Sequence, residues 1–155
     1  MEDLDMKKLW CIVLTMVLMF SIIQVGVNAV GTELEVISFP DGSYMTIELI
    51  VTQTKASGSI TGSKKSTYYG NDGSVEWIAV LSGSFSYTGA NATCTYSSMN
   101  ITIQDSNWYI VSKSATKSGS TAYGSAKMGV KSMGSTVTTV PVSLSLNCDA
   151  NGNLS

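Results

Sequence analysis

The chain has 155 residues, of which 13% are charged, and its formal net charge is −2. Its basic residues are nine lysines without any arginine, and it contains no histidine. These gaps exclude a Ser-His or Cys-His catalytic pair, an imidazole metal ligand and a bidentate arginine clamp. The slightly negative charge is also wrong for a nucleic-acid surface. We therefore expect no cofactor, no metal site, no nucleic-acid partner and no enzymatic activity.

The N-terminal residues have the layout of a secretory leader. Lys7 and Lys8 precede the uncharged run Leu9–Thr32, and Val27-Asn28-Ala29 places short residues at a cleavage site. A basic start, an apolar run and then small residues are typical of a signal peptide. We predict an apolar signal helix within residues 1–29 and cleavage between Ala29 and Val30. The product would be a secreted, extracellular domain of residues 30–155 that met the membrane only through its transient leader.

Two features of the leader leave alternatives open. The uncharged run is long enough to span a bilayer, so an uncleaved anchor is the competing interpretation. The acidic residues Glu2, Asp3 and Asp5 are unusual before a signal peptide, whereas translation from Met6 gives the ordinary opening MKKLW. We therefore hypothesise that Met6 is the true start.

The remaining chain, which is rich in serine and threonine, shows period-two alternation, the pattern of β-strands. The clearest case is Val75–Tyr87, in which apolar residues alternate with polar ones such as Glu76 and Ser84. Turn sequences rich in Gly, Asn and Asp separate the runs. The predicted strands, in chain order, are Leu34–Phe39, Tyr44–Thr54, Ser57–Tyr69, Val75–Tyr87, Ala92–Ile103, Trp108–Lys117, Thr121–Lys131 and Val140–Cys148.

Details of these runs predict where strands lie and where they bend. Lys64-Lys65 in the polar run Ser57–Tyr69 favours an edge strand protected by charge, and Pro141 also suits an edge. The alternation changes phase at Ser97-Ser98, which predicts a bulge or a short turn there. In the run from Trp108, Lys113 and Lys117 have the outward parity.

About eight short strands without a bridging helix imply antiparallel sheets. We predict an all-β fold, an antiparallel two-layer β-sandwich, with a small β-barrel as the alternative. Cys94 and Cys148 both have inward parity, and two cysteines in an exported domain predict a disulfide. Two buried thiols are the alternative. Gly83 stands in the apolar row of Val75–Tyr87, which indicates a bulge or a close approach of another part of the chain.

Four segments resemble one protein family. They are TYYGNDGSVEW (Thr67 to Trp77), GSFSYTGANATC (Gly83 to Cys94), NWYIVSKSATKSGSTA (Asn107 to Ala122) and VSLSLNCDANGNLS (Val142 to Ser155). The family consists of small exported proteins of Gram-positive anaerobic bacteria without an established function. The resemblance implies a secreted all-β domain with Cys94 paired to Cys148, and it implies no catalytic residue.

Tyrosines are the main candidates for binding. Tyr69, Tyr109 and Tyr123 have outward parity, and exposed tyrosines stack on sugar rings or contact protein partners. They are the candidate binding surface for an unknown extracellular ligand, either a glycan or a protein. The alternative for these tyrosines is cross-strand packing on a wet face.

Carboxylates offer a weaker candidate site. A glycosidase needs two of them at a defined separation, and Glu33, Glu35, Glu48 and Glu76 are the candidates, although solvated surface charges are the simpler interpretation. The segment Asp149–Asn153 has some features of a calcium loop but fits a turn better.

Three functions follow from this pattern, in order of preference. The first is a non-catalytic β-domain that binds a surface ligand. The second is a structural or envelope-associated protein that self-associates through its Ser/Thr faces. The third is a carboxylate-dependent hydrolase.

Overall fold

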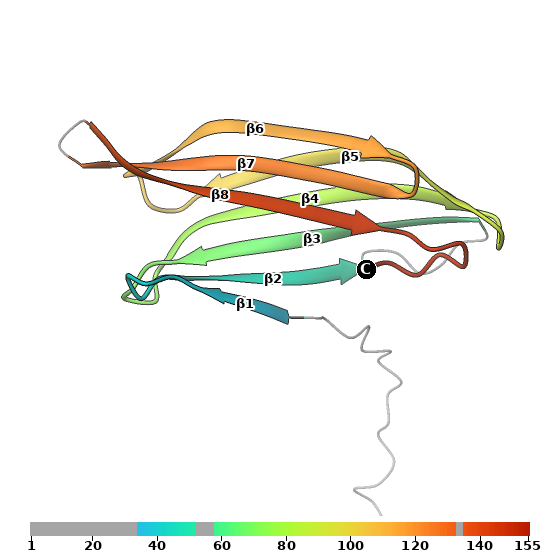
Figure 1. Ribbon diagram of the computed structural model, residues 1–155, viewed down its shortest axis with the longest axis horizontal. Helices are drawn as coiled ribbons and strands as arrows, with labels where there is room; N and C mark the ends of the chain where they lie inside the picture. Colours follow the sequence, from blue (N-terminus) through green and yellow to red (C-terminus); the bar gives the residue numbers. More distant parts are fainter. Residues whose placement is uncertain (1–33, 52–57, 133–134) are drawn as a thin grey trace, which may run out of the picture. The chain divides into compact units, whose positions relative to one another are not determined.

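A computed structural model shows the fold of the protein and describes residues 34–51, 58–132 and 135–155 (Figure 1). The predicted leader, its cleavage site at Ala29 and Val30, and Glu33 lie outside these residues. None of the described residues forms a helix capable of crossing a membrane. The strands are β1 (Leu34–Ser38), β2 (Tyr44–Val51), β3 (Ser59–Tyr69), β4 (Val75–Tyr87), β5 (Ala92–Ile103), β6 (Trp108–Ser118), β7 (Thr121–Ser132) and β8 (Ser135–Asn147).

The eight strands form two antiparallel sheets, which confirms the all-β prediction. One sheet has five strands in the order β1-β2-β3-β4-β5, and the other has three in the order β6-β7-β8. Every neighbour in a sheet is also a neighbour in sequence, as is usual for consecutive antiparallel strands. The three-stranded sheet packs against β3, β4 and β5. The arrangement is sandwich-like, with two layers around one core.

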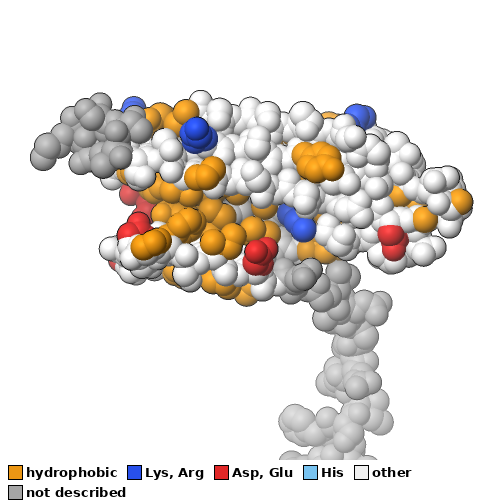
Figure 2. Space-filling model, in the orientation of Figure 1, with side chains coloured by type: hydrophobic (Ala, Val, Ile, Leu, Met, Phe, Trp, Pro, Cys, Tyr) orange, Lys and Arg blue, Asp and Glu red, His pale blue; other side chains and the backbone are white. Residues whose placement is uncertain are grey.

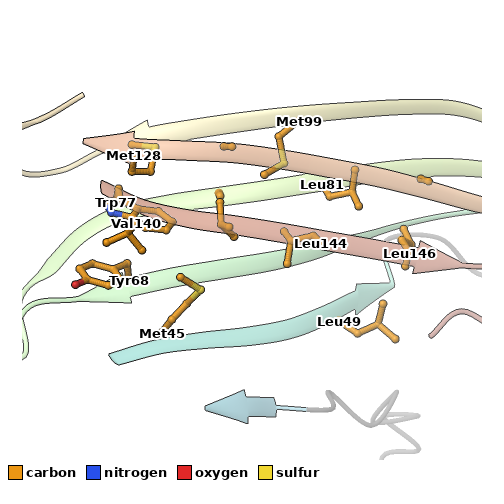
Figure 3. Packing of buried hydrophobic residues seen from close by; sticks show 14 of the residues in the cluster. Met45, Leu49, Tyr68, Trp77, Leu81, Met99, Met128, Val140, Leu144 and Leu146 are labelled. Atoms are coloured by element: carbon orange, nitrogen blue, oxygen red, sulfur yellow. The ribbon is translucent and has the colours of Figure 1, made fainter. Parts of the chain in front are cut away.

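The core consists of the inward rows of both sheets (Figure 3). On β4 the side chains of Trp77, Leu81 and Phe85 are no more than 1% exposed, as the alternation predicted. Met128 on β7 and Leu146 on β8 are fully buried on the opposite sheet. Burying a large apolar side chain contributes about 1.5–3 kcal/mol, so these inward rows hold the two sheets together.

Gly83 allows the sheets to approach closely. A Cβ atom at this position would lie 2.8 Å from the ring of Phe85 and 3.2 Å from Cβ of Ala122 on β7. Gly83 pairs regularly with both neighbouring strands, so the close approach is the explanation for this glycine and no bulge occurs at it.

The wider sheet extends past the narrower one. Among the described residues, the backbones of β1 and β2 do not closely approach the three-stranded sheet, although Met45 and Leu49 on β2 are buried in the core. Every residue of β1 is exposed, including Leu34 at 61% and Val36 at 56%. Figure 2 shows hydrophobic side chains gathered where the five-stranded sheet extends beyond β8. The chain therefore presents an apolar edge strand to solvent.

The prediction that the lysine-bearing run forms an edge strand is wrong. β3 is the central strand of its sheet, between β2 and β4. Its Lys65 is tolerated there because it lies opposite Glu48 on β2 and forms an ion pair with that carboxylate. Pro141, in contrast, does lie on an edge strand, since β8 ends the three-stranded sheet.

The register between strands is irregular at several places, and the bulges in β5 and β6 change the expected facing of residues near the groove and the turns. The phase change in β5 occurs at Thr95, because Ser84 pairs with Tyr96 whereas Phe85 pairs with Cys94. The expected position at Ser97-Ser98 is therefore slightly wrong. A second bulge at Val111 was not predicted.

The bulge at Val111 corrects the facing of two lysines. Lys113 and Lys117 lie opposite the buried Ala126 and Ala122, so they share the inward parity of those residues. They stay exposed because β6 is an edge strand. Lys117 uses this position to donate a hydrogen bond to the carbonyl oxygen of Thr95 on β5.

Both cysteines are buried, as their parity predicted, and they flank one turn. The backbone N–H of Cys94 donates to the carbonyl oxygen of Gly119 at 2.8 Å, and that of Cys148 donates to Ser120 at 3.0 Å. Both side chains are thiols in this structure, which therefore does not contain the predicted disulfide. Each thiol instead donates to a nearby backbone carbonyl, at 3.2 and 3.4 Å respectively. Burial raises the pKa of Cys94, which favours its thiol form.

Candidate binding groove

The outer face of the three-stranded sheet is built of rungs, each made of three residues that lie opposite one another on β6, β7 and β8. Thr116, Tyr123 and Ser145 form one rung. The next consists of Ser114, Ser125 and Ser143. Residues opposite one another share a face of the sheet, so these side chains all point away from the core.

A shallow groove of about 280 Å³ lies over these two rungs, and we call it the Tyr123 groove. Tyr123 is 45% exposed, so a large part of its ring is available for contact. The residues lining the groove are Ser114, Thr116, Tyr123, Gly124, Ser125, Ser143, Leu144 and Ser145.

Local sequence explains why the groove is open. The inward positions of β7 near Tyr123 are Ala122, Gly124 and Ala126, which are small and let the sheet lie close to the core. A Cβ atom at Gly124 would lie only 2.8 Å from Sδ of Met99 on β5. The outward positions alternate with them and carry a phenol and hydroxyls. A turn through Gly119 at a φ of 55° joins β6 to β7 and sets this register.

The groove combines an aromatic face with hydroxyl groups. The hydroxyls of Ser114 and Ser125 share a hydrogen bond of 3.0 Å across β6 and β7. A serine hydroxyl has one donor and two acceptor positions, so each retains capacity for a ligand. Hydroxyls beside an exposed ring suit a ligand with alternating polar and apolar surface, as a sugar ring has.

Tyr109 lies on the same outer face, two rungs beyond Ser125. Its ring covers Gly129, where a Cβ atom would lie 2.7 Å from Cζ of the tyrosine. The ammonium of Lys131 sits 4.8 Å from the ring centroid, within the range of a cation–π contact. The face therefore has an aromatic residue toward each end.

Tyr69 does not join this surface. It lies on β3 of the five-stranded sheet and stacks on Tyr44 of β2, with ring centroids 4.6 Å apart and planes 9° from parallel. That contact is the cross-strand packing considered as the alternative. Of the three candidate tyrosines, the structure brings Tyr109 and Tyr123 to one face and leaves Tyr69 on the other sheet.

Among the residues that the structure describes, the candidate carboxylates Glu35, Glu48 and Glu76 do not assemble as a group. Glu48 is engaged with Lys65, and Glu35 is exposed on the edge strand β1. Glu76 lies at the end of the sandwich where the turns after β1, β3 and β5 meet, in a cleft of about 500 Å³. We call this the loop-end cleft; it is lined by Asp41, Ser43, Tyr68, Gly70, Asn71, Glu76, Asp105, Asn107, Trp108, Val130 and Lys131.

Glu76 has a partner that sequence reasoning missed. Burial, followed by a hydrogen bond with the carboxyl group of Asp105, raises the pKa of Glu76. The backbone N–H of Asn107 donates to Asp105 and lowers the pKa of that residue. The pKa of Glu76 is thus raised while that of Asp105 is lowered, so Glu76 is the acid that is protonated first as the pH falls. Asp105 occupies a turn and has no strand parity that could have placed it beside Glu76.

The turn interpretation of Asp149 agrees with the geometry. Its carboxylate accepts the backbone N–H groups of Asn151 and Asn153, each at 2.8 Å, which closes the loop after β8. Across the residues that the structure describes, no group of three or more Cys, Asp or Glu side chains is arranged to hold a metal ion.

The comparisons with known proteins add no relative: no protein-family model, curated protein or solved structure matches this chain.

Proposed function

We propose that the protein is an exported, non-catalytic β-domain that binds a glycan at the Tyr123 groove. The observation that carries the proposal is a 45% exposed tyrosine ring standing among serine and threonine hydroxyls in a groove of about 280 Å³. Aromatic rings and hydroxyls together contact the two kinds of surface that a sugar presents. A rigid sheet holds these groups, so little conformational entropy would be lost on binding.

The groove favours a glycan over a folded protein partner. A stable protein interface needs roughly 800 Å² on each side and a central apolar cluster. The groove is small, and its lining is mostly hydroxyl-bearing. A protein ligand would have to extend well beyond it.

The test is glycan binding by purified residues 30–155, first on an array and then by calorimetry. We expect Tyr123→Ala to weaken binding at least tenfold, or about 1.4 kcal/mol, and Tyr123→Phe to retain most of it. Tyr96→Ala is the matched control, because Tyr96 is 56% exposed on the other sheet. Absence of glycan binding, or equal loss in both alanine variants, would refute the proposal.

Export is a separate part of the proposal, supported by the basic, apolar and small-residue order of the leader. N-terminal sequencing of protein recovered from the culture medium should begin at Val30. A product that keeps the leader would instead indicate a membrane anchor. The intact mass of the same sample decides the cysteine state, since a disulfide between Cys94 and Cys148 lowers it by about 2 Da relative to two thiols.

Self-association is the second candidate function, and the exposed apolar edge strand β1 favours it. Unpaired edges with hydrophobic side chains promote pairing with another chain. Leu34 and Val36 lie outward on this edge at 61% and 56% exposure. Sedimentation velocity over a hundredfold range of concentration tests it, with Val36→Lys expected to abolish any association.

The hydrolase alternative receives no support from the carboxylate geometry. Retaining and inverting glycosidases separate their carboxyl groups by about 5–5.5 Å and about 6.5–9.5 Å respectively. The carboxylates of Glu76 and Asp105 are instead engaged by the protein itself, since Trp108 donates to Glu76 and the backbone N–H of Asn107 donates to Asp105.

A further inference from the structure

The two sheets differ sharply in charge. From Trp108 to Asn147, which spans β6, β7 and β8, the sequence contains four lysines and no Asp or Glu. The part of the chain that forms β1 to β5 with their turns is acidic; its carboxylates are Glu35, Asp41, Glu48, Asp72, Glu76 and Asp105, against Lys55, Lys64 and Lys65. A domain with a small negative net charge thus keeps one sheet wholly cationic.

From this charge separation we infer that the glycan bound on the outer face of the three-stranded sheet is anionic. The inference rests on the proposed function, because it assigns the ligand class of the same surface. The shared chemistry is a negatively charged group on a sugar chain, whether that group is a carboxylate or a sulfate. Complementary potential guides such a ligand to the cationic sheet and away from the acidic one.

Two lysines lie on the outer face near the Tyr123 groove, where they can contact the anionic groups of such a ligand. Lys127 is exposed on the outer face, in the rung with Ser112 and Pro141 that directly follows the Tyr123 groove. Lys131 lies farther along β7, beside the ring of Tyr109. Among the described residues, no carboxylate comes within 4.0 Å of either ammonium group. Neither ammonium is therefore in an ion pair with a described carboxylate, although Lys131 also lines the loop-end cleft.

The spacing of these groups fits an extended chain. Tyr109 lies opposite Gly129, which is six positions from Tyr123 along β7. At about 3.3 Å per residue, the two tyrosines are roughly 20 Å apart, and Lys127 lies between them. A single sugar would reach one ring, whereas an oligosaccharide reaches both rings and the lysine between.

The aromatic and hydroxyl groups argue against a bare anion as the ligand. A lysine ammonium is a compact charge on a flexible stem and binds many anions without geometric selection. The rungs with Tyr123 and its neighbouring serines add a rigid surface that a free phosphate would leave uncovered. An anionic membrane is a different ligand class and is included as an outcome of the test.

The test compares matched pairs of polymers that differ in charge. Polygalacturonate is compared with its methyl-esterified form, which has the same backbone without the carboxylates, and dextran sulfate is compared with dextran. We expect at least tenfold tighter binding to the charged member of one pair, which also identifies the anionic group. This preference should decline as the salt concentration rises from about 50 to about 500 mM.

The variants separate this inference from the proposed function. The double variant Lys127→Gln, Lys131→Gln should lose the charge preference and its salt dependence but retain weak binding to the neutral polymer. Tyr123→Ala should lose binding to both members of each pair. The control Lys64→Gln, on the five-stranded sheet, should behave as the unaltered protein.

Each outcome has a defined meaning. Equal binding to neutral and charged polymers would overturn the inference and leave the proposed function standing. Absence of binding to any glycan would overturn both. Binding to vesicles containing an anionic phospholipid, without binding to the polymers, would replace the glycan with a membrane surface and would also overturn both.

Discussion

The indole Nε1–H of Trp108 donates a hydrogen bond of 3.1 Å to Oε2 of Glu76. Because Trp108 begins β6 and Glu76 lies on β4, this bond joins the two sheets at the loop end of the sandwich. The backbone strengthens the connection, since the carbonyl oxygen of Glu76 accepts the N–H groups of Gln104 and Asp105 at 2.8 and 3.1 Å. The protonation state of Glu76 therefore bears on the stability of the whole fold.

The first prediction concerns Glu76→Gln and pH. A raised pKa in the folded state means that Glu76 contributes stability below its ordinary pKa and loses that contribution as the pH rises through the folded value. The amide introduced by the substitution would keep a neutral donor toward Asp105 at every pH. The stability of the variant relative to the unaltered protein should therefore increase from about pH 4 to about pH 8.

Urea unfolding at several pH values measures this difference. Asp72→Asn serves as the control with the opposite sign, because hydrogen bonds from Ser74 lower the pKa of Asp72. That carboxylate stabilises the fold at pH values above its ordinary pKa. Asp72→Asn should therefore lower the free energy of unfolding more at neutral pH than at acid pH. A Glu76→Gln difference that stays constant with pH would show that folding does not raise the pKa of Glu76.

The second prediction concerns Ser66→Ala. The Ser66 side chain is fully buried on β3, and its hydroxyl has no hydrogen-bond partner within the described part of the chain. An unsatisfied buried hydroxyl is costly, so its removal should stabilise the protein by about 1 kcal/mol. Ser82→Ala should instead be neutral or destabilising, because Ser82 shares a 2.9 Å hydrogen bond with Ser63. Chemical denaturation of both variants checks the contrast, and a destabilised Ser66→Ala would contradict it.

Strand alternation was enough to predict most of the fold. The period-two rows of β4 placed Trp77 and Leu81 in the core, and parity placed Tyr123 on the solvent side. The bulges at Thr95 and Val111 could not be located, because an extra residue in a strand is defined by its partner strand. After each bulge, the remaining residues of the same strand face the side opposite to the one that simple alternation predicts.

Long-range partnerships were the other gap. Charge alone suggested an edge position for Lys65, but the register of β2 supplies Glu48 as its partner in the middle of a sheet. Asp105 lies beside Glu76 because β5 pairs with β4, which brings the residues that follow β5 next to the start of β4. Only part of the candidate groove could be predicted. Parity identified Tyr123, but the serines around it come from three strands, and only the pairing of those strands shows that they lie together.

The third prediction is that Leu81→Ala destabilises the protein by about 2–5 kcal/mol, the usual cost of a large cavity in a packed core. Leu81 is fully buried on β4 beside Gly124 and Met99. The same substitution at Leu34, which is 61% exposed, should change stability by less than about 0.5 kcal/mol. Thermal and urea unfolding of both variants measure this difference. Equal losses of stability would show that Leu81 is not part of the core.

The fourth prediction concerns the contact between Gly129 and Tyr109. A Cβ atom at residue 129 would lie 2.7 Å from Cζ of the tyrosine, so Gly129→Ala must displace the ring and its 4.8 Å contact with Lys131. We expect a cost of about 1 kcal/mol, as for mild overpacking. In a Tyr109→Ala background the obstacle is gone, and the substitution should be neutral or slightly stabilising, because alanine suits a strand better than glycine. Urea unfolding of the four proteins of this double-mutant cycle gives the coupling, and a cost that is equal in both backgrounds would mean that the ring does not lie over Gly129.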